Sequence, residues 1–76
     1  MFLNKADLKK FDDAIFPFEK AIEINDQFSD AYFNLGITLH ELNRFQDAEK
    51  SYKEAINLNC NYAEAYNNLG ITLNSL

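Results

Sequence analysis

Apolar and polar residues follow one another along this chain with the period of an α-helix. Between Phe11 and Ile24 the apolar residues recur at steps of three and four, as they do on one face of a helix. The same spacing returns in three later segments. Together the pattern predicts helices over about 11–24, 30–42, 45–58 and 63–76. Residues 1–10 carry a shorter, imperfect helical pattern, and no segment alternates like a strand, so the sequence predicts an all-α chain.

Several residues mark where these helices should begin, end or bend. Asn43 follows the second helix and suits a left-handed helix stop. Either Ser29 or Asp30 is expected to cap the start of the same helix with its side-chain oxygen. Pro17 removes a backbone hydrogen bond and costs about 3 kcal/mol inside a helix. We therefore expect the first helix to start late or to bend at this proline.

The second predicted helix is repeated later in the chain. Residues 30–39 read DAYFNLGITL and residues 64–73 read EAYNNLGITL, so eight of ten positions are identical at a fixed offset. The third helix repeats the first at the same offset, with Phe45 matching Phe11. Self-similarity at a period of about 34 residues is typical of stacked helix pairs. Arrays of this kind present a binding surface rather than a reaction centre.

The repeated residues resemble the tetratricopeptide repeat. The residues that carry the resemblance are Tyr32, Leu35, Gly36, Leu39, Ala48, Tyr52 and Ala55. It implies antiparallel helix-turn-helix repeats of about 34 residues, stacked as an α-solenoid. The expected units are an incomplete first repeat over 1–28, a complete repeat over 29–62 and the first helix of a third repeat over 63–76. The chain departs from the family in three ways. A tyrosine replaces the family's tryptophan, Cys60 replaces its proline, and the first repeat keeps only a remnant of its own first helix, before residue 11.

In this family the first helices of successive repeats line a concave groove that binds an extended peptide of a partner protein. The resemblance places ten residues of this chain in the groove: Phe33, Asn34, Ile37, His40, Glu41, Asn67, Asn68, Ile71, Asn74 and Ser75. The helical spacing agrees with this assignment. Phe33, Ile37 and His40 lie on a different stripe from the residues expected to form the core, so they should face away from it.

Asn34 and Asn68 occupy equivalent positions in the two repeats. A side-chain amide both donates and accepts, so stacked asparagines can bind a peptide backbone without reading its sequence. The pair is similar to the asparagine ladder in the repeats of O-GlcNAc transferases; the alternative is a solvated polar surface. Repeats that capture a terminal carboxylate have lysines where Phe33 and Asn67 stand here, so we do not expect carboxylate capture.

Charge and composition exclude several classes of function. Seven Lys and Arg against twelve Asp and Glu give a net charge of −5, without the basic stripe that nucleic acid requires. No apolar run approaches the roughly 18 residues of a membrane span, and the first residues lack the apolar core of a signal peptide. The single cysteine, Cys60, has no internal partner, which fits a cytoplasmic location. We expect neither a nucleic-acid nor a membrane partner.

No combination of residues predicts an active site or a cofactor site. His40 is the only histidine, and no second histidine or nearby cysteine completes a metal-binding set. A general base would also need a nucleophile or an orienting partner within reach. The two glycines lie at equivalent positions of two separate helices, which is unlike a phosphate-binding loop. We therefore predict a protein that is not an enzyme and has no cofactor or metal.

Both ends of the predicted array leave apolar residues uncovered. In the last helix these residues are Tyr66, Leu69, Leu73 and Leu76. The helix over 11–24 also lacks most of its partner, whereas stable arrays end in a polar capping helix. Either the chain is a piece of a longer array, or its ends meet in another copy.

Three functions remain open from the sequence. The first is a protein-interaction module that binds a peptide in its concave groove. The second is a structural repeat that self-assembles, by dimerising or exchanging helices through its terminal helices. The third is the interaction fragment of a larger enzyme, such as a repeat-containing glycosyltransferase, whose chemistry lies in other residues. In each case the partner is a protein or a peptide.

Overall fold

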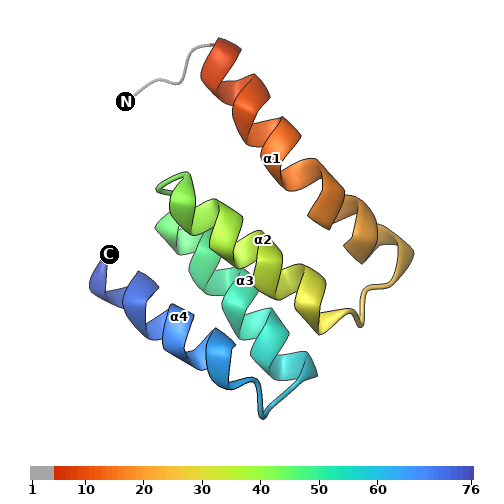
Figure 1. The fold of residues 1–76 in the computed structure, drawn as a ribbon, viewed down its shortest axis with the longest axis vertical. Helices are drawn as coiled ribbons and strands as arrows, with labels where there is room; N and C mark the ends of the chain where they lie inside the picture. The colour runs from red at the N-terminus through yellow and green to blue at the C-terminus, as the bar shows by residue number, and fades with distance from the viewer. Residues whose placement is uncertain (1–4) are drawn as a thin grey trace.

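The computed structural model describes residues 5–76, with side chains from Lys9 onward, and contains four helices in that range (Figure 1). They are α1 (Lys5–Ile24), α2 (Ser29–Glu41), α3 (Phe45–Leu58) and α4 (Ala63–Asn74). No strand occurs among these residues. The all-α prediction is confirmed, and the last three helices begin within one residue of the predicted positions.

The helices lie side by side in a slab with extents of 38 × 32 × 13 Å. Consecutive helices run in opposite directions, as Figure 1 shows. The central helix α2 packs against α1 and α3, and α3 in turn packs against α4. A lighter contact joins α2 to α4, the two helices that carry the repeated sequence. No helix of the described range is long and apolar enough to cross a membrane.

The turns after α1 and α3 have the same construction. The side-chain oxygen of Asn25 accepts a hydrogen bond from the backbone N–H of Gln27 at 3.1 Å. Asn59, at the equivalent position of the next repeat, accepts one from the N–H of Asn61 at 3.4 Å. Asparagine favours this local turn because its short side chain can bond the backbone two residues ahead. The sequence repeat is therefore also a repeat of turn geometry.

The helix-stop prediction is confirmed, but the cap prediction is wrong. Asn43 adopts the left-handed conformation, with φ of 62°. The residue at the cap of α2 is Phe28, which makes no side-chain cap hydrogen bond, while Ser29 is the first helical residue. The carboxylate of Asp30 instead accepts a hydrogen bond from the hydroxyl of Tyr62 at 2.8 Å. A contact between repeats has replaced the local cap.

The predicted late start of the first helix is also wrong, because α1 begins at Lys5 and continues through Pro17. Because Pro17 has no N–H, the carbonyl of Asp13 loses its helical hydrogen bond. Both residues are exposed, so water can bond that carbonyl. Ile15 is buried against α2, and such packing supplies most of a helix's stability. Residues 5–10, which we expected to be the remnant of a separate helix, belong to α1, and residues 1–4 lie outside the described range.

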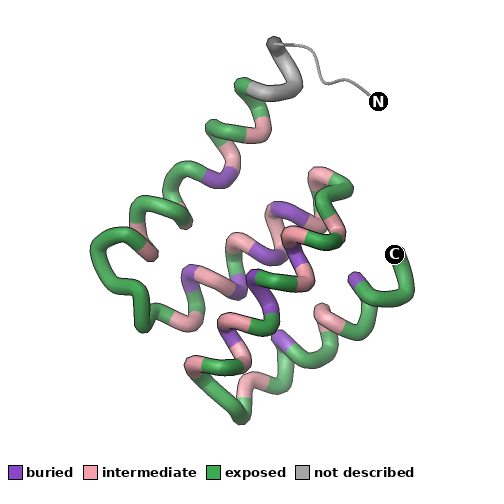
Figure 2. The backbone as a smooth tube through the Cα atoms, turned by 180° about the vertical axis from the view of Figure 1, so that it is seen from behind, coloured by how far each residue is buried: buried purple, intermediate pink, exposed green. Residues whose placement is uncertain are grey.

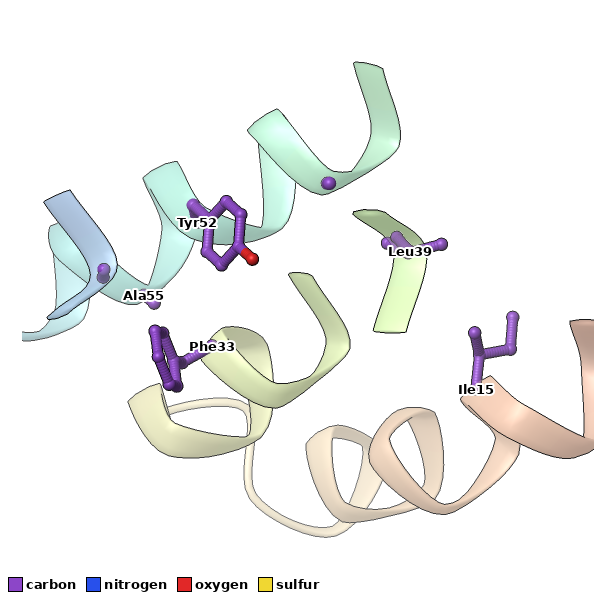
Figure 3. Packing of buried hydrophobic residues seen from close by; sticks show 7 residues of the cluster. Ile15, Phe33, Leu39, Tyr52 and Ala55 are labelled. Carbon is purple, nitrogen blue, oxygen red and sulfur yellow. The ribbon is translucent and has the colours of Figure 1, made fainter. Parts of the chain in front are cut away.

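The core is concentrated at the contact between α2 and α3, and Figure 2 shows most buried positions on these two helices. Tyr52 is only 2% exposed, and its ring lies over Gly36. Figure 3 shows Tyr52 and Ala55 of α3 facing α2, with Ile15 of α1 pointing towards the same core. Close approach of α2 and α3 therefore depends on a glycine facing an aromatic ring.

Candidate functional site

A hollow of about 270 Å³ lies between the two repeated helices, α2 and α4. It is lined by Ile37, His40, Glu41, Tyr52, Asn68 and Ile71. Ile37 and Ile71 are equivalent residues of the repeat, so each helix presents the same isoleucine to the hollow. The structure thus brings together five of the residues that the sequence analysis assigned to the groove.

The sixth lining residue, Tyr52, was not among the residues assigned to the groove. Its side chain comes from α3 and reaches the base of the hollow between α2 and α4. Burial raises the pKa of the Tyr52 phenol, while the neighbouring side chains of Asn68 and Thr72 partly offset this rise. The phenol therefore stays neutral at physiological pH and gives the hollow a polar point at its base.

His40 forms one wall of the hollow and joins α2 to α4. Its Nδ1 lies 2.9 Å from Oγ1 of Thr72, a residue with no exposed surface. The ring of Phe45 meets the imidazole edge-on, with 4.9 Å between ring centres. Because these contacts fix the ring, His40 acts in this arrangement as a bridge between helices.

Phe33 was predicted to line the groove, and this prediction is wrong. The side chain is 8% exposed, with its ring centre 4.9 Å from that of Tyr62 and 6.0 Å from that of Tyr52. Helical spacing would leave Phe33 at the surface only if α2 buried a single stripe. A helix packed against neighbours on several sides buries more than one stripe, which removes Phe33 from the surface.

The remaining predicted groove residues differ in their exposure. The exposed ones are Asn34, Glu41, Asn67, Ile71, Asn74 and Ser75. Asn68 is half-buried beside the hydroxyl of Tyr52, whereas Asn34 is exposed and does not line the hollow. The two equivalent asparagines therefore do not have equivalent surroundings.

A hydrogen bond between Tyr62 and Asp30 ties the start of α4 to the start of α2. This bond could not be predicted from the repeat, because the residue equivalent to Tyr62 is Phe28, which has no hydroxyl. Burial, with the hydrogen bond to Asp30 and the charges of Asp30 and Glu64, raises the pKa of Tyr62 to about 12. This contact helps to set the spacing between the walls of the hollow.

We expect the stabilisation that this bond provides to be lost in alkaline solution. Below pH 10.0, the ordinary pKa of tyrosine, Tyr62 is protonated in both the folded and unfolded chain, so the contribution is fully present. As the pH rises from there to about 12, the unfolded chain releases the proton first and stability is lost. Urea denaturation across this interval should show a shallower loss for Tyr62→Phe than for the unmodified chain. Equal losses would contradict the role assigned to the bond.

Electrostatically the hollow is neutral to acidic. Glu41 is its only charged lining residue among the described side chains, and neither lysine nor arginine lines it. An ion pair of Glu49 with Lys53, at 2.7 Å, lies on α3 outside the lining. Among the side chains described, from Lys9 onward, no group of three from His, Cys, Asp and Glu is placed to hold a metal ion.

The apolar residues predicted at the end of the array are mostly uncovered. Tyr66, Leu73 and Leu76 are exposed, while Leu69 is half-buried and packs against the core. At the opposite end, the exposed large apolar residues are Phe16, Ile24 and Phe28. Both ends of the slab therefore carry apolar surface in addition to the hollow.

Two family models match the chain. A model described as a tetratricopeptide repeat matches residues 18–50, and a second, described as a TPR repeat, matches residues 38–75. Together they extend from within α1 to the end of α4 and include all of the lining of the hollow. No curated protein matches the chain significantly.

Proposed function

Because the chain belongs to the tetratricopeptide repeat family, whose members are generally protein-interaction modules, we propose that it binds an extended peptide of a partner protein across α2 and α4 and catalyses no reaction. The observation that carries this proposal is the hollow between these helices. It is open to solvent, flanked by equivalent isoleucines and bordered by polar side chains.

The apolar walls suit the insertion of one apolar side chain of the peptide. Ile71 is 51% exposed, an unfavourable state for an isoleucine unless a partner covers it. At about 270 Å³ the hollow is small for a drug-sized ligand but has room for a single side chain. Covering Ile71 and the partly buried Ile37 would supply apolar contact on both sides of that side chain.

Polar groups around the hollow would orient the peptide. Asn68 lines it, and Asn34 is exposed on the equivalent face of α2, so the two amides can bond backbone N–H and C=O groups of an extended segment. Glu41 and the chain's net charge of −5 favour a basic or neutral peptide over an acidic one. We therefore assign as ligand an extended peptide with one apolar anchor and a neighbouring lysine or arginine.

This proposal can be tested with peptides selected from a random library on the intact chain. Ile71→Glu is expected to weaken binding tenfold or more, because it removes the free energy gained by burying one apolar side chain. Asn34→Ala is expected to weaken binding about fivefold, the loss of one or two hydrogen bonds. Affinities would be measured by isothermal titration calorimetry.

Two matched controls separate the groove from the rest of the surface. Ile24→Glu changes an isoleucine that is exposed at the end of α1, and Asn57→Ala changes an asparagine that is exposed on α3. Both should leave the affinity unchanged. The proposal fails if the library yields no binding peptide, or if Ile71→Glu and Asn34→Ala bind as tightly as the two controls.

A further inference from the structure

The repeated helices α2 and α4 share a sequence but not a covering helix. On α2, a Cβ atom added at Gly36 would lie 2.6 Å from the ring of Tyr52, a residue of α3 that covers this glycine. On α4, a Cβ added at Gly70 meets no described atom within 4 Å apart from its chain neighbours and the backbone of its own helix. Leu39 is 5% exposed, whereas its equivalent Leu73 is 45% exposed. The same face is therefore covered on α2 and uncovered on α4.

The second helices of the repeats, α1 and α3, also differ in how far they are covered. On α3, the residues that pack on α2 are buried, namely Ala48, Tyr52 and Ala55. Their equivalents on α1 are only half-buried, namely Ala14, Phe18 and Ala21. These α1 residues occupy positions that, on α3, are covered by the preceding helix of the same repeat. The chain thus carries both an uncovered α2-like face and a half-uncovered α3-like face.

Two substitutions between the repeats make the α1 face more apolar than its α3 counterpart. Phe16, which is 62% exposed, stands where α3 has Lys50. Pro17 stands where α3 has Ser51, and it is also exposed. Lys50 borders Tyr32 and Leu35 on the surface between α2 and α3. The equivalents of that pair on α4 are Tyr66, which is exposed, and Leu69.

We propose that the face of α4 around Gly70 is covered by α1 of a second copy of this chain, packed as α3 packs on α2. In this arrangement Phe18 of one copy lies over Gly70 of the next, as Tyr52 lies over Gly36. Phe16 lies beside Tyr66 and Leu69. The contact joins two different faces, so it is heterologous and adds copies head to tail. This interaction uses surfaces other than the proposed peptide groove.

A second copy carries a helix that fits this face. Its α1 has the same spacing of small and aromatic residues as the helix that already covers α2, so the docking would continue an interface present within each chain. Each copy has a net charge of −5, so copies repel one another through their overall charge while the contact itself is apolar. Association should therefore strengthen as salt screens that repulsion. A single helix-on-helix contact lies at the small end of interface sizes, which indicates affinities in the micromolar to millimolar range.

Gly70→Ala tests this docking by adding a methyl group without removing any contact. The methyl group meets empty space in the monomer but would meet the Phe18 ring in the docked pair. Sedimentation equilibrium from micromolar to millimolar concentration should show reversible association of the unmodified chain, weakened about tenfold or more by Gly70→Ala. Unspecific apolar adhesion would be unchanged by this substitution. Equal association of the two proteins, or a strictly monomeric unmodified chain, would overturn the proposal and leave the α4 face to a different partner.

A mixing experiment tests the head-to-tail geometry. Phe16→Glu places a charge on the α1 face, and Leu73→Glu places one on the α4 face; both residues are exposed, so the fold should persist and circular dichroism checks this. Each variant alone should remain monomeric. Mixed, they should form one-to-one dimers and nothing larger, because only one intact α1 face and one intact α4 face remain. Self-association of either variant alone would indicate a two-fold contact and contradict the proposal.

Ile71→Glu is the matched control, since Ile71 is an exposed apolar residue of the same helix that lines the hollow instead. This variant should associate like the unmodified chain while losing peptide affinity. The two proposals can therefore fail separately: lost association with intact peptide binding refutes only the docking of copies. Retained peptide affinity in Ile71→Glu refutes only the groove.

Discussion

Replacement of Tyr52 by alanine is expected to cause the largest loss of stability of any substitution considered. Truncating a buried large aromatic side chain costs about 3–5 kcal/mol. A folded chain of 76 residues has a free energy of unfolding of about 4–11 kcal/mol at ordinary stabilities per residue. The Tyr52 ring covers Gly36, packs near Phe33 and reaches the base of the hollow, so its removal should leave the chain largely unfolded or close to it.

Tyr52→Phe is the matched control because it keeps the ring and removes only the hydroxyl. It should cost at most about 1 kcal/mol, because the ring and its packing are kept. Urea denaturation followed by circular dichroism gives both free energies. If the alanine variant were as stable as the phenylalanine variant, the ring would not be the centre of the core.

The two repeat glycines should respond in opposite directions to the same substitution. Gly36→Ala places a Cβ atom 2.6 Å from a ring that is itself fixed in the core, and overpacking of this kind costs about 1–3 kcal/mol. Gly70→Ala meets no such obstacle and should gain about 0.5–1 kcal/mol, the ordinary advantage of alanine over glycine inside a helix.

This pair is internally controlled, since both glycines lie in the same short sequence, LGITL. Any effect of local sequence is therefore shared, and only the covering helix differs. Thermal and urea denaturation should be done at a concentration low enough to keep the chain monomeric. A change of the same sign at both positions would show that α3 does not approach α2 as closely as described.

Much of the fold could be predicted because the information is local and repeated. Helix positions follow from periodicity, and the stop at Asn43 follows from a residue type that tolerates positive φ. The errors arose where tertiary contacts outweigh local preference. Pro17 is tolerated because it is exposed to water while Ile15 packs α1 against the core. Asp30 does not cap α2 because it accepts a hydrogen bond from Tyr62, in the turn between α3 and α4.

The candidate site was predictable to a similar extent. The repeat and the family resemblance together placed Ile37, His40, Asn68 and Ile71 on one surface, and the structure places them around one hollow. The groove prediction for Phe33 was wrong because helical spacing cannot show how many neighbours a helix has. Tyr52 was missed because its backbone belongs to α3, and only the three-dimensional packing shows how far its ring extends.

Peptide binding in the hollow is tested most directly by a nuclear magnetic resonance titration of the monomeric chain with a selected peptide. If the peptide binds there, the amide shifts that change should be concentrated on the facing sides of α2 and α4, around Ile37, His40, Asn68 and Ile71. Changes confined to the end faces, around Phe16 and Leu73, or no saturable change at all, would contradict peptide binding in the hollow.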